Sequence, residues 1–263
     1  MMPPARLHPG HNMDKYDLYS RSVQDPAGEV RDFRKFYRQL KGRTPKSFRE
    51  DFCGTFSVCC EWVKLGPDYT ARGLDLDKEP LNYGRKRYLS ALTPAQRRRV
   101  KPMLKNALKP GGPASDLIVA QNFSYFTFKK RKTLLAYFVS CRKSLRPGGV
   151  LILDAFGGGD TLRPNSESTR YGNLTFYWEQ YSYDQITHEA HFAIHFKTRG
   201  GRKIKNVFTY DWRLWTIAEI RDLLAEAGFR KSHVYWEDDD GKFKRVEKGV
   251  DESAWVTMVL AEK

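Results

Sequence analysis

Two short segments of this chain carry residue types that could hold a nucleoside. They read Arg-Glu-Asp-Phe-Cys-Gly-Thr at 49–55 and Ala-Arg-Gly-Leu-Asp-Leu-Asp at 71–77. The first predicts a strand that ends in a tight glycine turn, with a helix over about residues 57–65. The second predicts a strand that ends on the carboxylate of Asp75. A glycine turn lets the backbone approach a ligand, and an acidic strand tip can accept hydrogen bonds from both ribose hydroxyls. Together the segments predict a site for an adenosine-containing cofactor.

The number of glycines in the turn discriminates between two such cofactors. A nicotinamide or flavin dinucleotide requires G-x-G-x-x-G, which places a pyrophosphate at a helix N-terminus. Residues 53–58 read Cys-Gly-Thr-Phe-Ser-Val, with a single glycine, and Phe56 leaves little room for a pyrophosphate. S-adenosylmethionine carries no phosphate, so the turn favours it over NAD.

Further motifs in the expected order make the chain resemble the class I S-adenosylmethionine-dependent methyltransferases of the small-molecule type. The family's first motif is an acidic residue, two further residues and then C-G-T-G, and it is matched by Glu50, Cys53, Gly54 and Thr55. The family has small residues or glycine where Phe52 and Phe56 stand. The later motifs are a G-x-D at 73–75, a third strand at 100–107, a fourth strand at 116–123, and an L-x-P-G-G turn with a fifth strand at 145–154.

The resemblance covers about residues 45–155 and implies an α/β fold with a seven-stranded, mostly parallel Rossmann-like sheet. It implies S-adenosylmethionine as cofactor and S-adenosylhomocysteine as product. Asp75 would bind the ribose, Asn106 would accept from the adenine amine, and residues 121–123 would face the methionine part. An N-terminal tyrosine would close over the cofactor. The cofactor-binding residues implied are Tyr19, Arg49, Glu50, Cys53, Gly54, Thr55, Asp75, Leu76, Asn106, Ala107, Gln121, Asn122 and Phe123.

The remaining chain predicts elements on either side of this core. Residues 1–44 are expected to form a loose tail over 1–12 and then lid helices at 16–19 and 26–40, before a methyltransferase domain at 45–263. Alternating runs at 174–183, 190–197 and 203–211 predict a three-stranded antiparallel insert over about 172–212. A helix at 217–227 follows, and Thr216 and Glu219 have the spacing of a capping box. Strands at 231–237 and 254–262 would close the domain, with 238–251 as a hairpin in solvent.

The insert supplies the candidates for binding the methyl acceptor, because antiparallel strands cover the active site in small-molecule enzymes of this kind, including glycine N-methyltransferase-like ones. The methyl group is already activated, so the protein mainly positions donor and acceptor, and the sequence designates no catalytic residue. Three neighbouring histidines, at 188, 191 and 195, lack the cysteine or patterned carboxylates of a metal site, so no metal is predicted. The substrate-side candidates are Trp178, Glu179, His191, Tyr210, Arg213 and Trp215.

The charge leaves an alternative open. The chain has 46 Lys and Arg against 31 Asp and Glu, a net charge of +15 and a pI near 9.6. This would suit a basic RNA-binding protein or an RNA methyltransferase on the same fold, or an acidic small substrate. However, the basic runs 97–99 and 129–132 are typical of solvated helix faces, and Gln-Asn-Phe-Ser at 121–124 differs from the N-P-P-[YF] of base-modifying enzymes. A small-molecule acceptor is therefore favoured over nucleic acid.

No apolar run approaches the ~20 residues that a membrane span requires. The N-terminal residues lack the apolar segment of a signal peptide, so the sequence predicts no membrane partner and a cytoplasmic location.

Overall fold

The computed structural model describes residues 14–110 and 112–263, and the tail expected at 1–12 lies outside them. Two helices precede the sheet, α1 (Lys15–Ser22) and α2 (Pro26–Lys41). Asp14 and Asp25 cap their first turns by accepting backbone N–H groups, and α2 ends at Gly42, whose φ of 65° is readily adopted only by glycine.

The main sheet has eight strands in the order β11-β10-β12-β5-β4-β1-β2-β3. The five from β5 to β3 pair in parallel, whereas β12 runs antiparallel to both of its neighbours and β11 antiparallel to β10. Their bounds are β1 (Ser47–Asp51), β2 (Thr70–Asp75), β3 (Val100–Leu104), β4 (Ser115–Ala120), β5 (Leu145–Gly157), β10 (Lys231–Glu237), β11 (Phe243–Val246) and β12 (Trp255–Glu262).

This sheet corrects the sequence-based prediction of seven strands, because β11 is an eighth. It lies in the segment 238–251 that was expected to be a hairpin in solvent, and it pairs with β10 from Val234↔Val246 to Glu237↔Phe243. Its short sequence, Phe-Lys-Arg-Val, carries two central charges, which hid an edge strand among charged loop residues.

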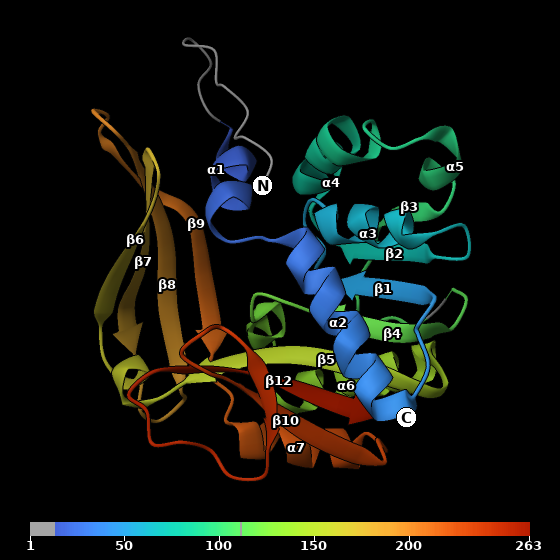
Figure 1. Ribbon diagram of the computed structural model, residues 1–263. Coiled ribbons are helices and arrows are strands. Elements are labelled where there is room, and N and C mark those ends of the chain that lie inside the picture. The colour runs from blue at the N-terminus through green and yellow to red at the C-terminus, as the bar shows by residue number, and fades with distance from the viewer. Residues whose placement is uncertain (1–13, 111) are drawn as a thin grey trace.

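Helices cover both faces of the main sheet, and the alternation of strand side chains sorts the core into two clusters. On β4 and β5, Leu117, Val119, Val150 and Ile152 pack with α2 and α3 (Ser57–Trp62). Their neighbours Ile118, Ala120, Leu151 and Leu153 pack with α6 (Arg131–Ser144) and α7 (Ile217–Glu226). In Figure 1, α2 crosses in front of the strands. The helical elements after α2 are α3 (Ser57–Trp62), η1 (Val63–Leu65), α4 (Lys78–Gly84), the π-helical η2 (Arg85–Leu89), α5 (Pro94–Arg97), η3 (Ser124–Thr127), α6 (Arg131–Ser144), η4 (Gly159–Leu162) and α7 (Ile217–Glu226).

A separate antiparallel sheet follows β5, and it has four strands in the order β6-β7-β8-β9 instead of the three expected. Its strands are β6 (Asn165–Tyr171), β7 (Leu174–Tyr183), β8 (Glu189–Thr198) and β9 (Lys203–Arg213). The insert therefore begins at Asn165 and not near residue 172. The first strand escaped the sequence pattern because Asn-Ser-Glu-Ser-Thr-Arg-Tyr has no buried position and hence no alternation of apolar residues.

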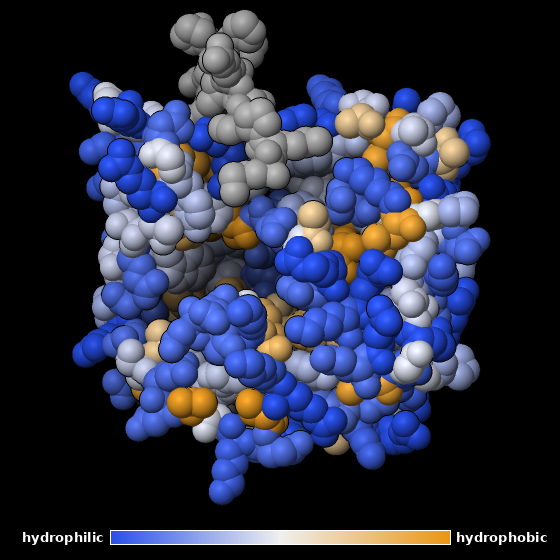
Figure 2. All heavy atoms as spheres, viewed as in Figure 1, coloured by the Kyte–Doolittle hydropathy of each residue, from blue (hydrophilic) through white to orange (hydrophobic). Residues whose placement is uncertain are grey.

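The insert stands beside the main sheet, and α1 lies at its upper end (Figure 1). Leu18 of α1 packs with Ile194 and Phe196 of the insert, and the Tyr19 ring lies 5.1 Å from the ring of Phe208. In the same view, Figure 2 shows a recess between the insert and the main body of the molecule. Across residues 14–110 and 112–263, no helix has both the length and the apolarity to cross a membrane.

Candidate functional site

The ends of four parallel strands meet at one edge of the main sheet. Strand pairing places Asp51, the last residue of β1, beside Ala120 of β4 and Leu74 of β2, and Asp75 beside Leu104 of β3. From β1 the chain progresses to β2 and β3 in one direction and later to β4 and β5 in the other. In open α/β sheets, ligands bind at the carboxyl ends of the strands where the order reverses in this way.

The two loops at this reversal, after β1 and after β4, have unusual backbone conformations. Six described residues other than glycine have positive φ, and four of them lie in these loops: Phe52 (56°), Phe56 (47°), Asn122 (55°) and Phe123 (55°). Side chains with a Cβ disfavour this region, and such strain is concentrated at functional sites. The strained backbone therefore identifies the loops after β1 and β4 as the candidate site.

The bulky residues of the first loop are accommodated by the core. Phe56 is fully buried, and two glycines opposite it leave room for the turn. A Cβ at Gly84 would lie 2.1 Å from the Thr55 carbonyl oxygen, and one at Gly73 would lie 2.7 Å from the Cys53 Sγ. These glycines thus provide the space beside the turn that small side chains provide in the related motif.

The glycine turn is joined directly to the acidic strand tip. The Gly54 backbone N–H donates to Asp75 Oδ2 at 2.7 Å, and the Asp77 N–H donates to Oδ1 at 2.8 Å. Asp75 is half-buried, and burial raises the pKa of its carboxyl group despite these bonds. A carboxylate offers about four lone-pair positions, so the Asp75 side chain can still accept two hydroxyl groups. Beside it, Leu76 is 68% exposed.

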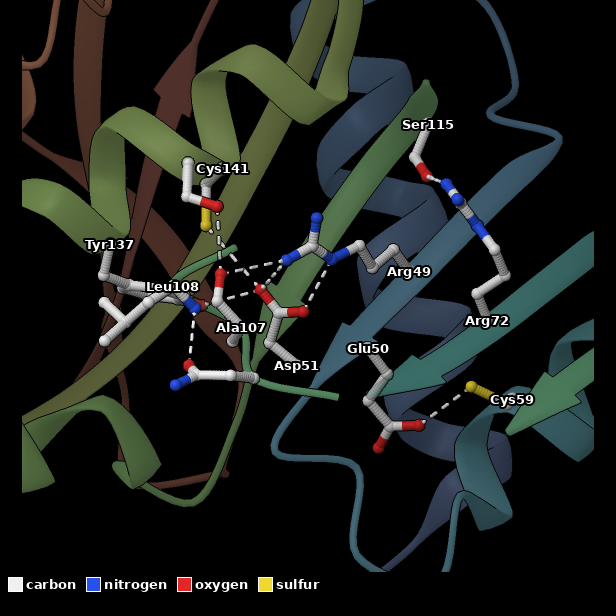
Figure 3. Close-up of polar contacts among 12 residues, drawn as sticks. Arg49, Glu50, Asp51, Cys59, Arg72, Ala107, Leu108, Ser115, Tyr137 and Cys141 are labelled. Atoms are coloured by element: carbon white, nitrogen blue, oxygen red, sulfur yellow. Dashed lines mark hydrogen bonds and ion pairs between the residues drawn. The ribbon is translucent and has the colours of Figure 1, made fainter. Parts of the chain in front are cut away.

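Three consecutive charged residues of β1 are separated between the two faces of the sheet. Arg49 is fully buried and donates to Asp51 through Nε at 2.6 Å and through an Nη at 3.0 Å, with the Tyr137 hydroxyl donating to Asp51 at 3.1 Å. Glu50 points the other way, and its carboxylate accepts from the Cys59 thiol at 3.1 Å (Figure 3). Arg49 thus lies in the core against α6.

The other implied cofactor residues are placed as follows. Asn106 Oδ1 accepts from the Leu108 N–H at 2.9 Å, which leaves its second lone pair and its NH2 group for a ligand. Ala107 is buried, and its carbonyl oxygen accepts from Ser140. The Thr55 hydroxyl is buried beside the turn with no hydrogen-bond partner in the described part of the chain. The Gln121 NH2 group contacts the Met258 sulfur at 3.9 Å.

Three carboxyl groups near this edge, those of Glu29, Glu50 and Asp154, form no ion pair with a lysine or arginine within the described residues. Burial raises the pKa of Glu50 to about 8, and burial likewise raises the pKa values of Glu29 and Asp154 to about 7. Asp154 accepts from the Phe123 N–H at 2.9 Å, which fixes the loop after β4. Because no arginine or lysine is among the groups that shift these three pKa values, the edge favours a ligand that brings positive charge.

A cavity of about 490 Å³ opens between this edge and the insert. Its walls come from α1, the loop after β4, the end of β5, η4, the inner face of the insert and two C-terminal segments. The lining includes a set of aromatic side chains and a set of carboxylates. The aromatic residues are Tyr19, Phe123, Phe156, Phe176, Trp178, Tyr210, Trp212 and Trp255, and the acidic residues are Asp160, Glu167, Glu237, Asp238, Asp239 and Glu252.

The structure brings two of the six substrate-side candidates into this cavity, Trp178 and Tyr210. Side chains alternate along a strand, so their neighbours lie on the outer face of the insert. There Glu179 pairs with His195 at 2.9 Å, and the half-exposed His191 pairs with Asp211 at 3.1 Å.

The remaining two candidates pack against the body of the molecule. The Arg213 guanidinium lies 3.8 Å from the centre of the Trp215 ring and pairs with Glu219 at 2.9 Å. Trp215 is 2% exposed. These two residues join the insert to α7, whose predicted capping box between Thr216 and Glu219 is present.

Sequence reasoning missed most of the polar lining. Gln180 is two residues after Trp178 on β7, so strand periodicity places both side chains on the same face of the insert. The carboxylates come from the end of β10 and the loop after it (237–239), from residue 252, from η4 and from β6. Among the described residues no lysine or arginine lines the cavity, so the mouth is acidic and not the basic one that would suit an acidic substrate.

Comparisons with known proteins agree on the fold. No protein-family model and no curated protein sequence matches the chain. Among solved structures, an S-adenosylmethionine-dependent methyltransferase from Clostridium acetobutylicum is similar with a TM-score of 0.68 at 18% identity, over 94% of this chain and 96% of that one.

Two further solved structures are similar to this chain, each with a TM-score of 0.69. CalS10, an amino pentose methyltransferase from Micromonospora echinaspora, is 14% identical over 97% of this chain and 99% of its own. DesVI from Streptomyces venezuelae is 17% identical over 95% of this chain and 99% of its own. The order of the main strands, the loops at the carboxyl edge and these likenesses together lead to one conclusion: the chain has the fold of the class I S-adenosylmethionine-dependent methyltransferases.

Proposed function

We propose that the chain is an S-adenosylmethionine-dependent methyltransferase whose methyl acceptor is a small molecule bound in the cavity. The observation that carries this proposal is the position of the loop after β4. Asn122 and Phe123 lie at the carboxyl edge beside the glycine turn, and they also line the cavity. A donor held at the edge would therefore present its reactive end to whatever occupies the cavity.

The residues present fit this cofactor in two respects. S-adenosylmethionine carries a sulfonium and an ammonium group, and the carboxyl groups of Glu50 and Asp154 have raised pKa values that a cationic ligand would relieve. The buried Thr55 hydroxyl lacks a partner beside the turn, so a ligand atom there would satisfy it.

Each residue would contribute a distinct contact. Asp75 would accept from the ribose hydroxyls while it keeps the Gly54 N–H, and Asn106 would bind the adenine edge. The exposed Leu76 side chain would lie against the adenine ring, and the backbone at 53–55 would approach the cofactor closely. Tyr19 would close the site from α1, where its hydroxyl interacts with Tyr210, and its pKa is raised mainly by burial. Arg49 has no place in this set, because it is fully buried with Asp51.

The chemistry asks the protein for positioning. When bound, S-adenosylmethionine supplies a methyl group already activated by a sulfonium. The aromatic walls hold the acceptor, and together with α1 they exclude water from the reacting atoms. Fixing two reactants in this way can contribute up to ~7–11 kcal/mol. Similar solved structures include an amino pentose and a sugar N-methyltransferase, which supports a small-molecule acceptor.

Calorimetry tests the cofactor assignment. S-adenosylmethionine and S-adenosylhomocysteine should both bind, whereas NAD should produce no heat. Incubation with methyl-labelled cofactor should then transfer label to members of a metabolite panel and not to RNA. Binding of NAD alone, or label only on RNA, would contradict the proposal.

A further inference from the structure

The cavity has a charge opposite to that of the whole protein. The chain carries a net charge of +15, yet six carboxylates line the cavity. Two of them have basic partners, Asp160 with Arg163 and Asp238 with Lys244, both at 2.7 Å. Within residues 14–110 and 112–263, the other four form no ion pair, and they are Glu167, Glu237, Asp239 and Glu252. The cavity thus contains negative charge that the protein itself does not neutralise.

A buried amide adds an acceptor that lacks a donor. Gln180 lines the cavity at 4% exposure, and its Nε2 donates to the carbonyl oxygens of Thr161 at 2.9 Å and Ser182 at 3.4 Å. These two carbonyls fix the orientation of the amide, because only the NH2 group can donate to them. The Oε1 atom makes no hydrogen bond within the described residues, so a ligand with an N–H group would satisfy it.

The apolar walls of the cavity are mainly aromatic, with eight aromatic side chains beside Val23, Ile194, Ala254 and Val256. The Tyr210 and Trp212 rings lie 4.4 Å apart, and Trp178 lies 5.8 Å from Tyr210. On the side of the main sheet, the ring centres of Phe123 and Phe156 lie 4.5 Å apart with their planes tilted by 55°. Aromatic faces attract cations through their quadrupole, and the attraction increases when water is excluded.

The carboxylates are too widely distributed to chelate a metal. They come from η4, from β6, and from the segments at 237–239 and 252. In the described part of the chain, no three His, Cys, Asp or Glu side chains are grouped so that they could hold a metal ion. The arrangement suits a larger organic cation with charge at one end and an apolar body.

We infer that the acceptor is an organic amine, protonated in solution, whose ammonium group is attracted by the carboxylates and donates to the Gln180 oxygen while its body packs on the aromatic walls. This inference rests on the proposed methyltransferase function and specifies the substrate class of the same site.

The transfer itself balances without another reactant. The ammonium nitrogen first loses a proton to Glu237, which lines the cavity at the end of β10 and whose pKa is raised by burial and by the adjacent Asp238. The freed lone pair attacks the methyl carbon, the N–C bond forms, and the C–S bond breaks with its electron pair remaining on sulfur. The products are the N-methylated amine and a neutral thioether, and the proton passes from Glu237 to solvent.

Binding of a matched pair of probes tests the charge preference independently of catalysis. Choline and its neutral carbon isostere, 3,3-dimethylbutan-1-ol, have the same shape, and the fluorescence of the cavity tryptophans can report both. We expect choline to bind at least about tenfold more tightly. The triple variant Glu237→Gln, Asp239→Asn, Glu252→Gln should abolish this difference. Asp251→Asn, an exposed neighbour outside the lining, should preserve it.

A methyl-transfer assay provides the second test of the amine inference. With labelled cofactor, benzylamine should accept the methyl group in preference to benzyl alcohol and benzoate, and the triple variant should raise the KM for the amine at least about tenfold without changing cofactor affinity. Equal affinities of the two probes, absence of choline binding, or preference for benzoate would overturn the amine inference. Choline preference without cofactor binding would instead refute the methyltransferase function alone.

Discussion

The backbone N–H of Gly54 donates to the Asp75 carboxylate across 2.7 Å, so the turn after β1 and the tip of β2 form one unit. Asp75 accepts from the Asp77 N–H as well. The residue expected to bind ribose is therefore also the residue that holds the turn in its left-handed conformation.

This double role determines the outcome of substitutions at Asp75. Asp75→Ala should lower S-adenosylmethionine affinity at least about tenfold, because charge-assisted hydrogen bonds are worth ~1.5–3 kcal/mol each. Asp75→Asn keeps one acceptor oxygen, so its cofactor affinity should lie between those of the parent protein and of Asp75→Ala. Calorimetry gives the affinities, and thermal unfolding without cofactor separates loss of the turn from loss of contacts. An Asp75→Ala protein that folds and binds normally would show that ribose lies elsewhere.

Cofactor affinity should rise with pH. Glu50, with a pKa of about 8, and Asp154, with a pKa of about 7, must be ionised to attract a cation. Between pH 6 and pH 8.5 the dissociation constant should fall, with proton release on binding near the lower end. Titration in two buffers of different ionisation enthalpy measures that release. Glu50→Gln should flatten the profile, and a pH-independent affinity in the parent protein would contradict the electrostatic argument.

The same carboxyl groups predict the pH dependence of stability without cofactor. Their folded-state pKa values are above the unfolded values near 4, so the folded chain binds more protons in the interval between. Their contribution to stability is complete below the unfolded pKa and is lost as pH rises through about 7 to 8. Denaturant unfolding should show a lower free energy at pH 8 than at pH 5.5, and Glu50→Gln should reduce the difference.

The buried pair on β1 should matter for stability and not for binding. Arg49→Met would leave Asp51 buried without its partner and should cost ~3–5 kcal/mol. The double variant Arg49→Met, Asp51→Leu removes both charges and should recover most of that loss. Urea unfolding measures the cycle, with cofactor affinity as control. Equal stability of the single variant and the parent would mean that Arg49 is not the partner of Asp51.

Substitutions at Trp178 and Trp215 should distinguish acceptor binding in the cavity from packing of the insert against α7. Trp178→Leu removes a wall of the cavity and should raise the acceptor KM while cofactor affinity is unchanged. Trp215→Phe alters a packed contact with Arg213 and should lower the melting temperature without that change in KM. The reverse pattern would place the acceptor at the α7 end.

Much of the main sheet follows from its sequence, because parallel strands buried on both faces produce short apolar runs between loops with strong turn signals. The run at 117–120 lies in β4, which is buried at every position, and is an example. The predicted strand at 231–237 has the same bounds as β10, and the predicted helix at 217–227 extends one residue past α7. β6 and β11 lack this contrast between buried and exposed positions, so no periodicity reveals them.

The candidate site was harder to predict, because it depends on which face of a strand each residue occupies. Glu179 is adjacent to Trp178 in sequence, yet strand geometry sends the two side chains to opposite faces. Asp239 and Glu252 are distant from the insert in sequence, and the fold alone brings them to the cavity. Net charge does not predict the sign of the cavity for a related reason, since it averages over the whole chain, whereas the cavity is lined by carboxylates.

The separation of charges along β1 has a consequence for how this protein can diverge. Arg49 and Asp51 form a closed pair in the core, whereas Glu50, between them, lies on the opposite face next to Cys59. Among natural variants we expect positions 49 and 51 to be replaced together, as a coupled pair, and position 50 to change independently with the ligand that the edge accommodates. Three adjacent positions would then be under two different constraints, with folding acting on positions 49 and 51 and ligand binding on position 50.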